Sequence, residues 1–224
     1  MDFYSFIIQN KEVFKLVYSL IVVAICLLIV FRSNKFFKLS LHNGIRYFRN
    51  AFLFFAVGFF IRYIVKFIIP ENYFPHYNII ITSLFEFFLI TGGFFLLYSL
   101  MWGKFEVKKG SRSSLLNFRV VIFYTLSVII VLLDYLWSTL YFMFALQIII
   151  FLYASIISFT KINKNKQRQF PKLYFIAMLL ALFAWTLNAL VILLGLGLFS
   201  MINIYIFNLI FFLLFLYGVV KVTI

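Results

Sequence analysis

Seven long apolar stretches, separated by six short connectors, constrain the fold of this chain more than any other feature. Each stretch is close to the roughly 20 residues that an α-helix needs to cross the hydrocarbon core of a bilayer. The stretches are apolar on every face, whereas a membrane-spanning strand needs only about 10 residues with strict alternation. The sequence therefore predicts an all-α, polytopic seven-helix bundle that forms one transmembrane domain over residues 1–224. The predicted spans are 14–31, 47–69, 78–102, 115–134, 136–160, 173–196 and 200–220.

The composition indicates that lipid is the main solvent of the chain. Hydrophobic residues make up 66% of the sequence, 34 residues are Phe, and the mean hydropathy is +1.11. A soluble domain needs more polar side chains than this to cover its surface. The spans and connectors use nearly all of the 224 residues, which leaves no room for a soluble catalytic or nucleic-acid-binding domain. We therefore expect a multi-pass protein of the cell membrane, with the lipid bilayer as its partner.

The formal net charge of +14 does not point to nucleic acid, because most of the Lys and Arg residues lie in or beside the gaps between apolar stretches. Anionic lipid headgroups attract basic residues at such positions. We expect no nucleic-acid partner.

The basic residues also predict the orientation of the bundle. The first, third and fifth connectors, together with Lys221, hold 16 of the 20 Lys and Arg residues. The other four are Lys11, Lys15, Arg62 and Lys66. Because cytoplasmic connectors carry an excess of Lys and Arg, the N-terminus is predicted to lie outside and the C-terminus in the cytoplasm. This orientation requires an odd number of spans, and seven satisfies it.

Two charged residues lie at membrane depth in neighbouring spans. Arg62 is in the second span and Glu86 is in the third, and both spans meet at the same predicted outer connector. Ionisable side chains are costly in a bilayer, so they are candidate functional residues and are expected to be paired. We predict an ion pair between Arg62 and Glu86 inside the outer half of the bundle, with Lys66 reaching the outer interface.

Further polar side chains occur at a similar depth in the later spans. They predict a cavity that opens to the outer side, with an apolar wall and a few convergent polar groups, as in small-molecule sites. The candidate ligand or pathway residues are Arg62, Glu86, Gln147, Trp185, Asn188 and Asn208.

A structural interpretation of the same residues stays open. The charged pair can act as a link between adjacent helices, each amide can form an interhelical hydrogen bond, and Trp185 can be a packing residue. Small residues such as Gly92 and Gly93 are expected to mark close contacts between helices.

The sequence does not support an enzyme, a cofactor or a metal site. His42 and His76 lie in connectors on opposite sides, and Cys26, in the first span, is the one cysteine of the chain. Haem ligation within the bundle, a multi-histidine metal centre and a Ser-His dyad are therefore excluded. An intramembrane aspartyl mechanism needs two carboxylates that share a site, whereas Asp134 lies at a helix end and Glu86 has a predicted cationic partner, which disfavours this mechanism. No glycine-rich phosphate-binding loop occurs.

The layout of the whole chain resembles that of rhodopsin-like and other seven-helix receptor or sensor modules. Local support comes from Trp185 in the sixth span and from the turn Gly195-Leu196-Gly197 before the last span. The segment from Asn43 to Phe52 is also similar to the start of the second helix in small prokaryotic membrane sensor modules. Retinal proteins of the rhodopsin-like family attach their chromophore to a lysine midway along the last helix. Residues 203–220 contain none, so the resemblance implies a receptor or sensor without retinal.

We therefore expect a membrane sensor or receptor-like module that binds a small or lipidic ligand in the outer half of the bundle. A small transporter or channel is the first alternative, with Arg62 and Glu86 lining a pathway. The second is a non-catalytic accessory subunit whose Phe-rich faces pack against a membrane-protein partner.

Overall fold

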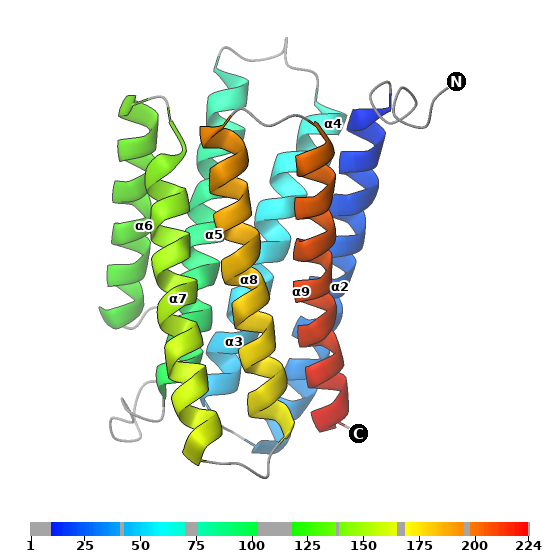
Figure 1. The fold of residues 1–224 in the computed structure, drawn as a ribbon, viewed down its shortest axis with the longest axis vertical. Helices are drawn as coiled ribbons and strands as arrows, with labels where there is room; N and C mark the ends of the chain where they lie inside the picture. Colours follow the sequence, from blue (N-terminus) through cyan, green and yellow to red (C-terminus); the bar gives the residue numbers. More distant parts are fainter. Residues whose placement is uncertain are drawn as a thin grey trace.

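The computed structural model describes residues 10–40, 43–69, 76–102, 118–137, 139–164, 169–194 and 198–223. These residues form seven helical rods that run side by side in one bundle (Figure 1). The second rod consists of three consecutive helical segments, and the other six are single α-helices. The rods are α2 (Lys11–Ser40), α3–η1–α4 (Asn43–Phe59, Phe60–Val65 and Lys66–Ile68), α5 (Tyr77–Met101), α6 (Phe118–Trp137), α7 (Tyr141–Lys164), α8 (Gln169–Leu193) and α9 (Leu198–Thr223).

The prediction of an all-helical, membrane-type bundle is confirmed. Each of the seven predicted spans overlaps one rod, and six rods are long and apolar enough to cross a membrane. In α9 the part whose side chains are described includes a shorter apolar stretch, Tyr205–Lys221. Parts of the basic connectors, residues 103–117 and 165–168, and the predicted turn at 195–197 lie outside the described residues.

The two ends of the bundle are defined here by the first and last rods. α2 begins at the end opposite to the one at which α9 stops (Figure 1). We call these the N-terminal end and the C-terminal end of the bundle. The number of membrane crossings and the compartment that each end faces stay predictions.

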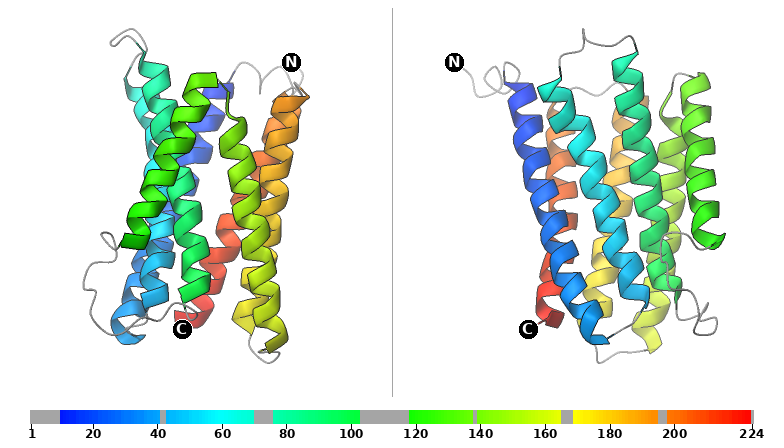
Figure 2. Two further views of the ribbon diagram at one scale, coloured as in Figure 1. Left: turned by 90° about the vertical axis from the view of Figure 1, so that its left-hand side faces the viewer. Right: turned by 180° about the vertical axis from the view of Figure 1, so that it is seen from behind.

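α3 and α5 form the centre of the packing. α3 packs against α5 on one side and α2 on the other, and α9 lies between α8 and α2. α7 packs on α5 and α8, whereas α6 packs on α5 and α7 at the edge of the bundle (Figure 2). Burial reflects the contrast between α5 and α6, because 61% of the most apolar stretch of α5 is buried but only 17% of that of α6. α6 therefore exposes most of its apolar surface to the surroundings of the bundle.

Close approach of α3 and α5 depends on small residues. A Cβ atom added at Gly92 would lie 2.8 Å from Cε1 of Phe55 and 3.2 Å from the carbonyl oxygen of Ala51. At Gly93 it would lie 2.9 Å from Oε1 of Gln147 on α7. The expectation that these two glycines mark tight helix contacts is confirmed.

The second rod is not the uniform helix that the apolar pattern predicts. Residues 60–65 form a π-helical segment between α3 and the single turn of α4. A π-helical segment widens the backbone by pairing residues five apart, which rotates the side chains that follow it. Arg62 lies in this segment, and the direction of its side chain therefore departs from the α-helical expectation.

The turn between α6 and α7 differs from the predicted boundary by about four residues. Asp134 was predicted to end the fourth span, but α6 continues to Trp137 and α7 begins at Tyr141. The carboxylate of Asp134 accepts hydrogen bonds from the backbone N–H groups of Phe142 (3.0 Å) and Met143 (2.8 Å). These groups have no partner within their own helix, so Asp134 caps α7 from the last turn of α6.

Candidate functional site

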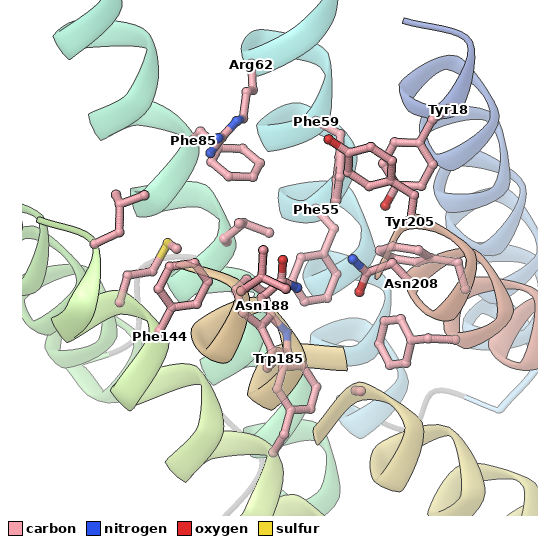
Figure 3. A pocket seen from close by; sticks show the side chains of 18 of the residues that line it. Tyr18, Phe55, Phe59, Arg62, Phe85, Phe144, Trp185, Asn188, Tyr205 and Asn208 are labelled. Atoms are coloured by element: carbon pink, nitrogen blue, oxygen red, sulfur yellow. The ribbon is translucent and has the colours of Figure 1, made fainter. Parts of the chain in front are cut away.

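A cavity of about 150 Å³ lies inside the half of the bundle nearer the N-terminal end. Side chains from α2, the second rod, α5, α7, α8 and α9 line it. Most of the lining side chains are aromatic (Figure 3). We call this space the aromatic cavity. Its aromatic wall includes Tyr18, Phe55, Phe59, Tyr63, Phe85, Phe144, Phe151, Trp185, Tyr205, Phe211 and Phe212.

Ring contacts join the helices around the aromatic cavity. The rings of Tyr18 on α2 and Tyr205 on α9 stack at a centroid distance of 4.6 Å. The Phe59 ring meets the Phe85 ring edge to face at 5.8 Å and the Phe212 ring at 5.9 Å. Offset-stacked and edge-to-face geometries are those that aromatic pairs favour. The rings thus form a continuous rigid wall from α2 through α3 and α5 to α9.

Arg62 brings a positive charge to this wall. Its guanidinium carbon lies 4.3 Å from the Phe85 ring centroid and 5.8 Å from the Tyr63 centroid. A cation held over aromatic faces gains about 0.5–2 kcal/mol depending on its exposure. Within the described part of the chain, the guanidinium has no carboxylate partner and no hydrogen-bond acceptor. Its N–H groups therefore remain available to a ligand in the cavity.

Three further polar groups face the same space. The buried hydroxyl of Tyr18 points towards Asn208 but makes no hydrogen bond of normal geometry with a described residue (Figure 3). The amide nitrogen of Asn188 donates to the carbonyl oxygen of Ala184 at 3.0 Å, which leaves its side-chain oxygen for the cavity. The cavity therefore offers a guanidinium, two side-chain amides and the unpaired hydroxyl of Tyr18 within a mostly aromatic wall.

The predicted ion pair between Arg62 and Glu86 is not formed. The one salt bridge among the described residues joins Lys15 and Glu12 at 2.8 Å. Successive residues of an α-helix point about 100° apart, so Phe85 and Glu86 face different neighbours. Phe85 meets Arg62, and Glu86 points instead towards the α6–α7 side of the bundle.

Glu86 lines a second cavity, of about 510 Å³, between the tips of α5, α6 and α7. Asp134 lines it as well, with the hydroxyl groups of Thr82, Ser83 and Thr139. We call this space the acidic cavity. Leu140 and Ile192 line both cavities, so the two spaces are neighbours.

Gln147 lies apart from both cavities. Its side chain is fully buried where α7 faces Gly93 of α5, and it is not part of either lining. Neither its amide nitrogen nor its amide oxygen has a hydrogen-bond partner in the described structure. The predicted set of six residues is therefore divided. Arg62, Trp185, Asn188 and Asn208 meet in the aromatic cavity, Glu86 lies in the neighbouring one, and Gln147 is a buried contact residue.

Sequence reasoning did not assign Tyr18 and Tyr205 to the site. Tyr18 is the one tyrosine in the first apolar stretch, and Tyr205 is the one tyrosine in the first half of the last apolar stretch. Their polar tips were the available signal, because a buried tyrosine hydroxyl usually has a partner. Asp134 was noted as a helix-end residue, but its place beside Glu86 depends on how α6 packs against α5.

The described residues contain no group of three or more His, Cys, Asp or Glu side chains that could hold a metal ion. Cys26 is buried in α2, and Asn203 and His42 lie among the residues whose side chains are not described.

Comparison of the chain with known protein families, with curated proteins and with solved structures found no match.

Proposed function

We propose that this chain is a seven-span membrane protein of the sensor or receptor type, with its N-terminal end outside the cell. It binds a small or lipidic molecule in the aromatic cavity. The observation that carries this proposal is the convergence of Arg62, Asn188, Asn208 and the unpaired Tyr18 hydroxyl on one aromatic-walled space. An apolar wall with few polar groups is the usual composition of small-molecule sites.

The polar groups define the class of ligand. A guanidinium donates hydrogen bonds in a planar fork that suits a carboxylate or phosphate, and the amides and the hydroxyl add neutral donors and acceptors. A cavity of roughly 150 Å³ accepts a group about the size of a benzene ring. The ligand is therefore an anionic or strongly polar head on a ring or short apolar chain, and a longer tail extends between the helices into the bilayer.

The π-helical segment gives the site a means of responding. An anionic head at Arg62 competes with the faces of Phe85 and Tyr63 for the guanidinium. Single-turn π segments within helices are frequent at functional sites. A change in the π segment shifts or rotates α3, whose first two turns carry Arg46 and Arg49 at the C-terminal end of the bundle. The ligand thereby acts on the end of the bundle predicted to be cytoplasmic.

Binding can be tested with benzoate and toluene, which have the same ring with and without an anionic head. The protein is placed in lipid nanodiscs with Trp102 and Trp137 replaced by Phe, so that Trp185 reports alone. We expect a saturable change in Trp185 emission with both compounds. Arg62→Gln should weaken benzoate binding about tenfold or more, equivalent to about 1.4 kcal/mol, and leave toluene binding within about twofold.

The matched control is Lys66→Gln, which removes an exposed positive charge one turn further along the same rod. It should leave both affinities unchanged. Failure of benzoate to change the emission of the unmodified site, or equal benzoate affinity in the Arg62→Gln protein, would contradict the proposal.

Transport is the second candidate function, and the neighbouring positions of the two cavities favour it. A path that passes from Arg62 in one cavity to Glu86 in the other would run along Leu140 and Ile192. Proteoliposomes with the protein should then take up radiolabelled benzoate faster than protein-free liposomes. Binding without uptake supports the sensor.

A further inference from the structure

Glu86 presents to the acidic cavity a carboxylate that has no partner among the described residues. Glu86 is only 3% exposed, and its side chain lines the cavity. It makes no hydrogen bond or ion pair with any residue that the structure describes. A buried carboxylate is costly unless it is paired and hydrogen-bonded. The oxygens of Glu86 are therefore available to a positively charged ligand, and the described lining supplies no such charge itself.

The nearest basic side chain faces the other cavity. Arg62 rests on the ring of Phe85, at 4.3 Å, with that ring as part of the aromatic wall. Glu86 follows Phe85 in α5, but its side chain lines the acidic cavity and not the aromatic cavity that Arg62 faces. The described lining of the acidic cavity contains no Lys, Arg or His.

Asp134 adds negative charge to the same space but has less capacity for a ligand. It is 2% exposed, and its carboxylate already accepts the backbone N–H groups of Phe142 and Met143. The hydroxyl of Thr139 lies 3.4 Å from the same carboxylate. Asp134 therefore makes the cavity more attractive to a cation, while Glu86 has the free oxygens to contact it.

The rest of the lining defines the shape of the cation. Thr82, Ser83 and Asn78 contribute oxygen atoms that can accept hydrogen bonds, and Ile79, Leu140 and Ile192 form an apolar side. A volume of about 510 Å³ is far larger than a bare metal ion needs. A calcium site would also need about six to eight oxygen ligands, several of them charged, whereas one carboxylate is free here.

We propose that the acidic cavity binds the primary ammonium group of an amine, with Glu86 as its counter-ion. The three ammonium hydrogens are donated to Glu86 and to oxygens of Thr82, Ser83 or Asn78, and the attached carbon chain lies on the apolar side. The amine is either a free molecule or the headgroup of an ethanolamine lipid, which have this ammonium in common. The site is distinct from the aromatic cavity and does not depend on the ligand bound there.

The wild-type protein in phosphatidylcholine nanodiscs provides the first test, with butylammonium, butanol and tetramethylammonium as probes. Butanol has the same chain without charge, and tetramethylammonium has the charge without N–H donors. We expect a saturable rise in the unfolding midpoint with butylammonium alone. Equal effects of butanol or tetramethylammonium, or no effect of butylammonium, would overturn the proposal without requiring any variant to fold.

A second test uses Glu86→Gln, which keeps the shape of the side chain and removes its charge. This variant should lose the butylammonium effect, and its matched control Glu12→Gln, at an exposed position paired with Lys15, should keep it. A butylammonium effect that persists in Glu86→Gln would contradict the assignment.

The lipid composition of the nanodiscs distinguishes a free amine from an ethanolamine lipid headgroup as the source of the ammonium. If the natural ligand is the lipid headgroup, phosphatidylethanolamine in the nanodiscs raises the unfolding midpoint of the wild type but not of Glu86→Gln. Butylammonium then gives a smaller further rise in the wild type. A free amine as the natural ligand leaves the butylammonium response unchanged in these nanodiscs. Either result supports an ammonium site at Glu86, provided that butylammonium stabilises the wild type.

Discussion

At the scale of single residues, the direction in which a side chain points matters more than its depth. Arg62 and Glu86 lie at similar depth, as the sequence predicts, yet one faces the aromatic cavity and the other faces the acidic cavity. The depth follows from counting residues along each span. The direction depends on the π-helical segment and on the rotation of α5, which the apolar pattern of residues 60–65 does not show.

Charge reversal distinguishes the observed arrangement from an ion pair. Arg62→Glu and Glu86→Lys should each lower the yield of folded protein, because each places a new charge in an environment built for the other sign. The double variant should be less stable than either single variant, since the two side chains are not partners. Unfolding midpoints in detergent provide the measurement. Recovery of wild-type stability in the double variant would show that the ion pair exists.

Gln147 offers a second test at this scale. Both of its polar amide atoms are buried without a described partner, which leaves their desolvation uncompensated. Gln147→Met keeps the length of the side chain and removes both atoms, so stability should stay equal or rise by about 1 kcal/mol. The unfolding midpoint measures this change. A clear loss of stability would indicate that Gln147 has a partner, such as an internal water.

At the scale of elements, the number and approximate positions of the helices could be predicted because a bilayer imposes a minimum length on each span. The ends could not. Asp134 resembles a helix-terminating residue in sequence, but it lies in the last turn of α6, and its carboxylate caps α7 across the turn. This contact depends on two helices being in place, and no pattern within either helix contains it.

The contacts of α5 with α3 at Gly92 and with α7 at Gly93 lead to a prediction for these two glycines. Gly92→Ala should destabilise the protein by about 1–3 kcal/mol, because the new methyl group meets the Phe55 ring at 2.8 Å and the Ala51 backbone at 3.2 Å. Gly93→Ala is the matched control. Its methyl group meets the flexible end of Gln147 at 2.9 Å, which can move, so the loss should be smaller. Unfolding midpoints of the two variants are compared, and a greater loss at Gly93 would contradict the packing described here.

At the scale of the whole molecule, the candidate site was predicted in part. Trp185, Asn188, Asn208 and Arg62 do meet, because polar groups at one depth in a bundle of this size have few places to go other than the interior. The aromatic partners on α2 and α9 could not be chosen from among 34 Phe and 14 Tyr residues, since their selection depends on which helices are neighbours. The division of the predicted cavity into the aromatic cavity and the acidic cavity also depends on which helices are neighbours, so the sequence did not predict it.

The orientation of the bundle is the remaining prediction at this scale. The described helices place the start of α2 and the stop of α9 at opposite ends, and the charge distribution predicts which end is cytoplasmic. Single cysteines at positions 71, 108 and 164, in a Cys26→Ala background, can be tested with a membrane-impermeant maleimide on intact cells. Glu71→Cys should react from outside, whereas Lys108→Cys and Lys164→Cys should react only after the cells are opened. Two predicted spans, 115–134 and 136–160, separate positions 108 and 164, so both positions should face the same compartment. Labelling from opposite sides would mean that the chain crosses the membrane an odd number of times between them. That result would contradict the assignment of the N-terminal end, where both cavities lie, to the outside of the cell.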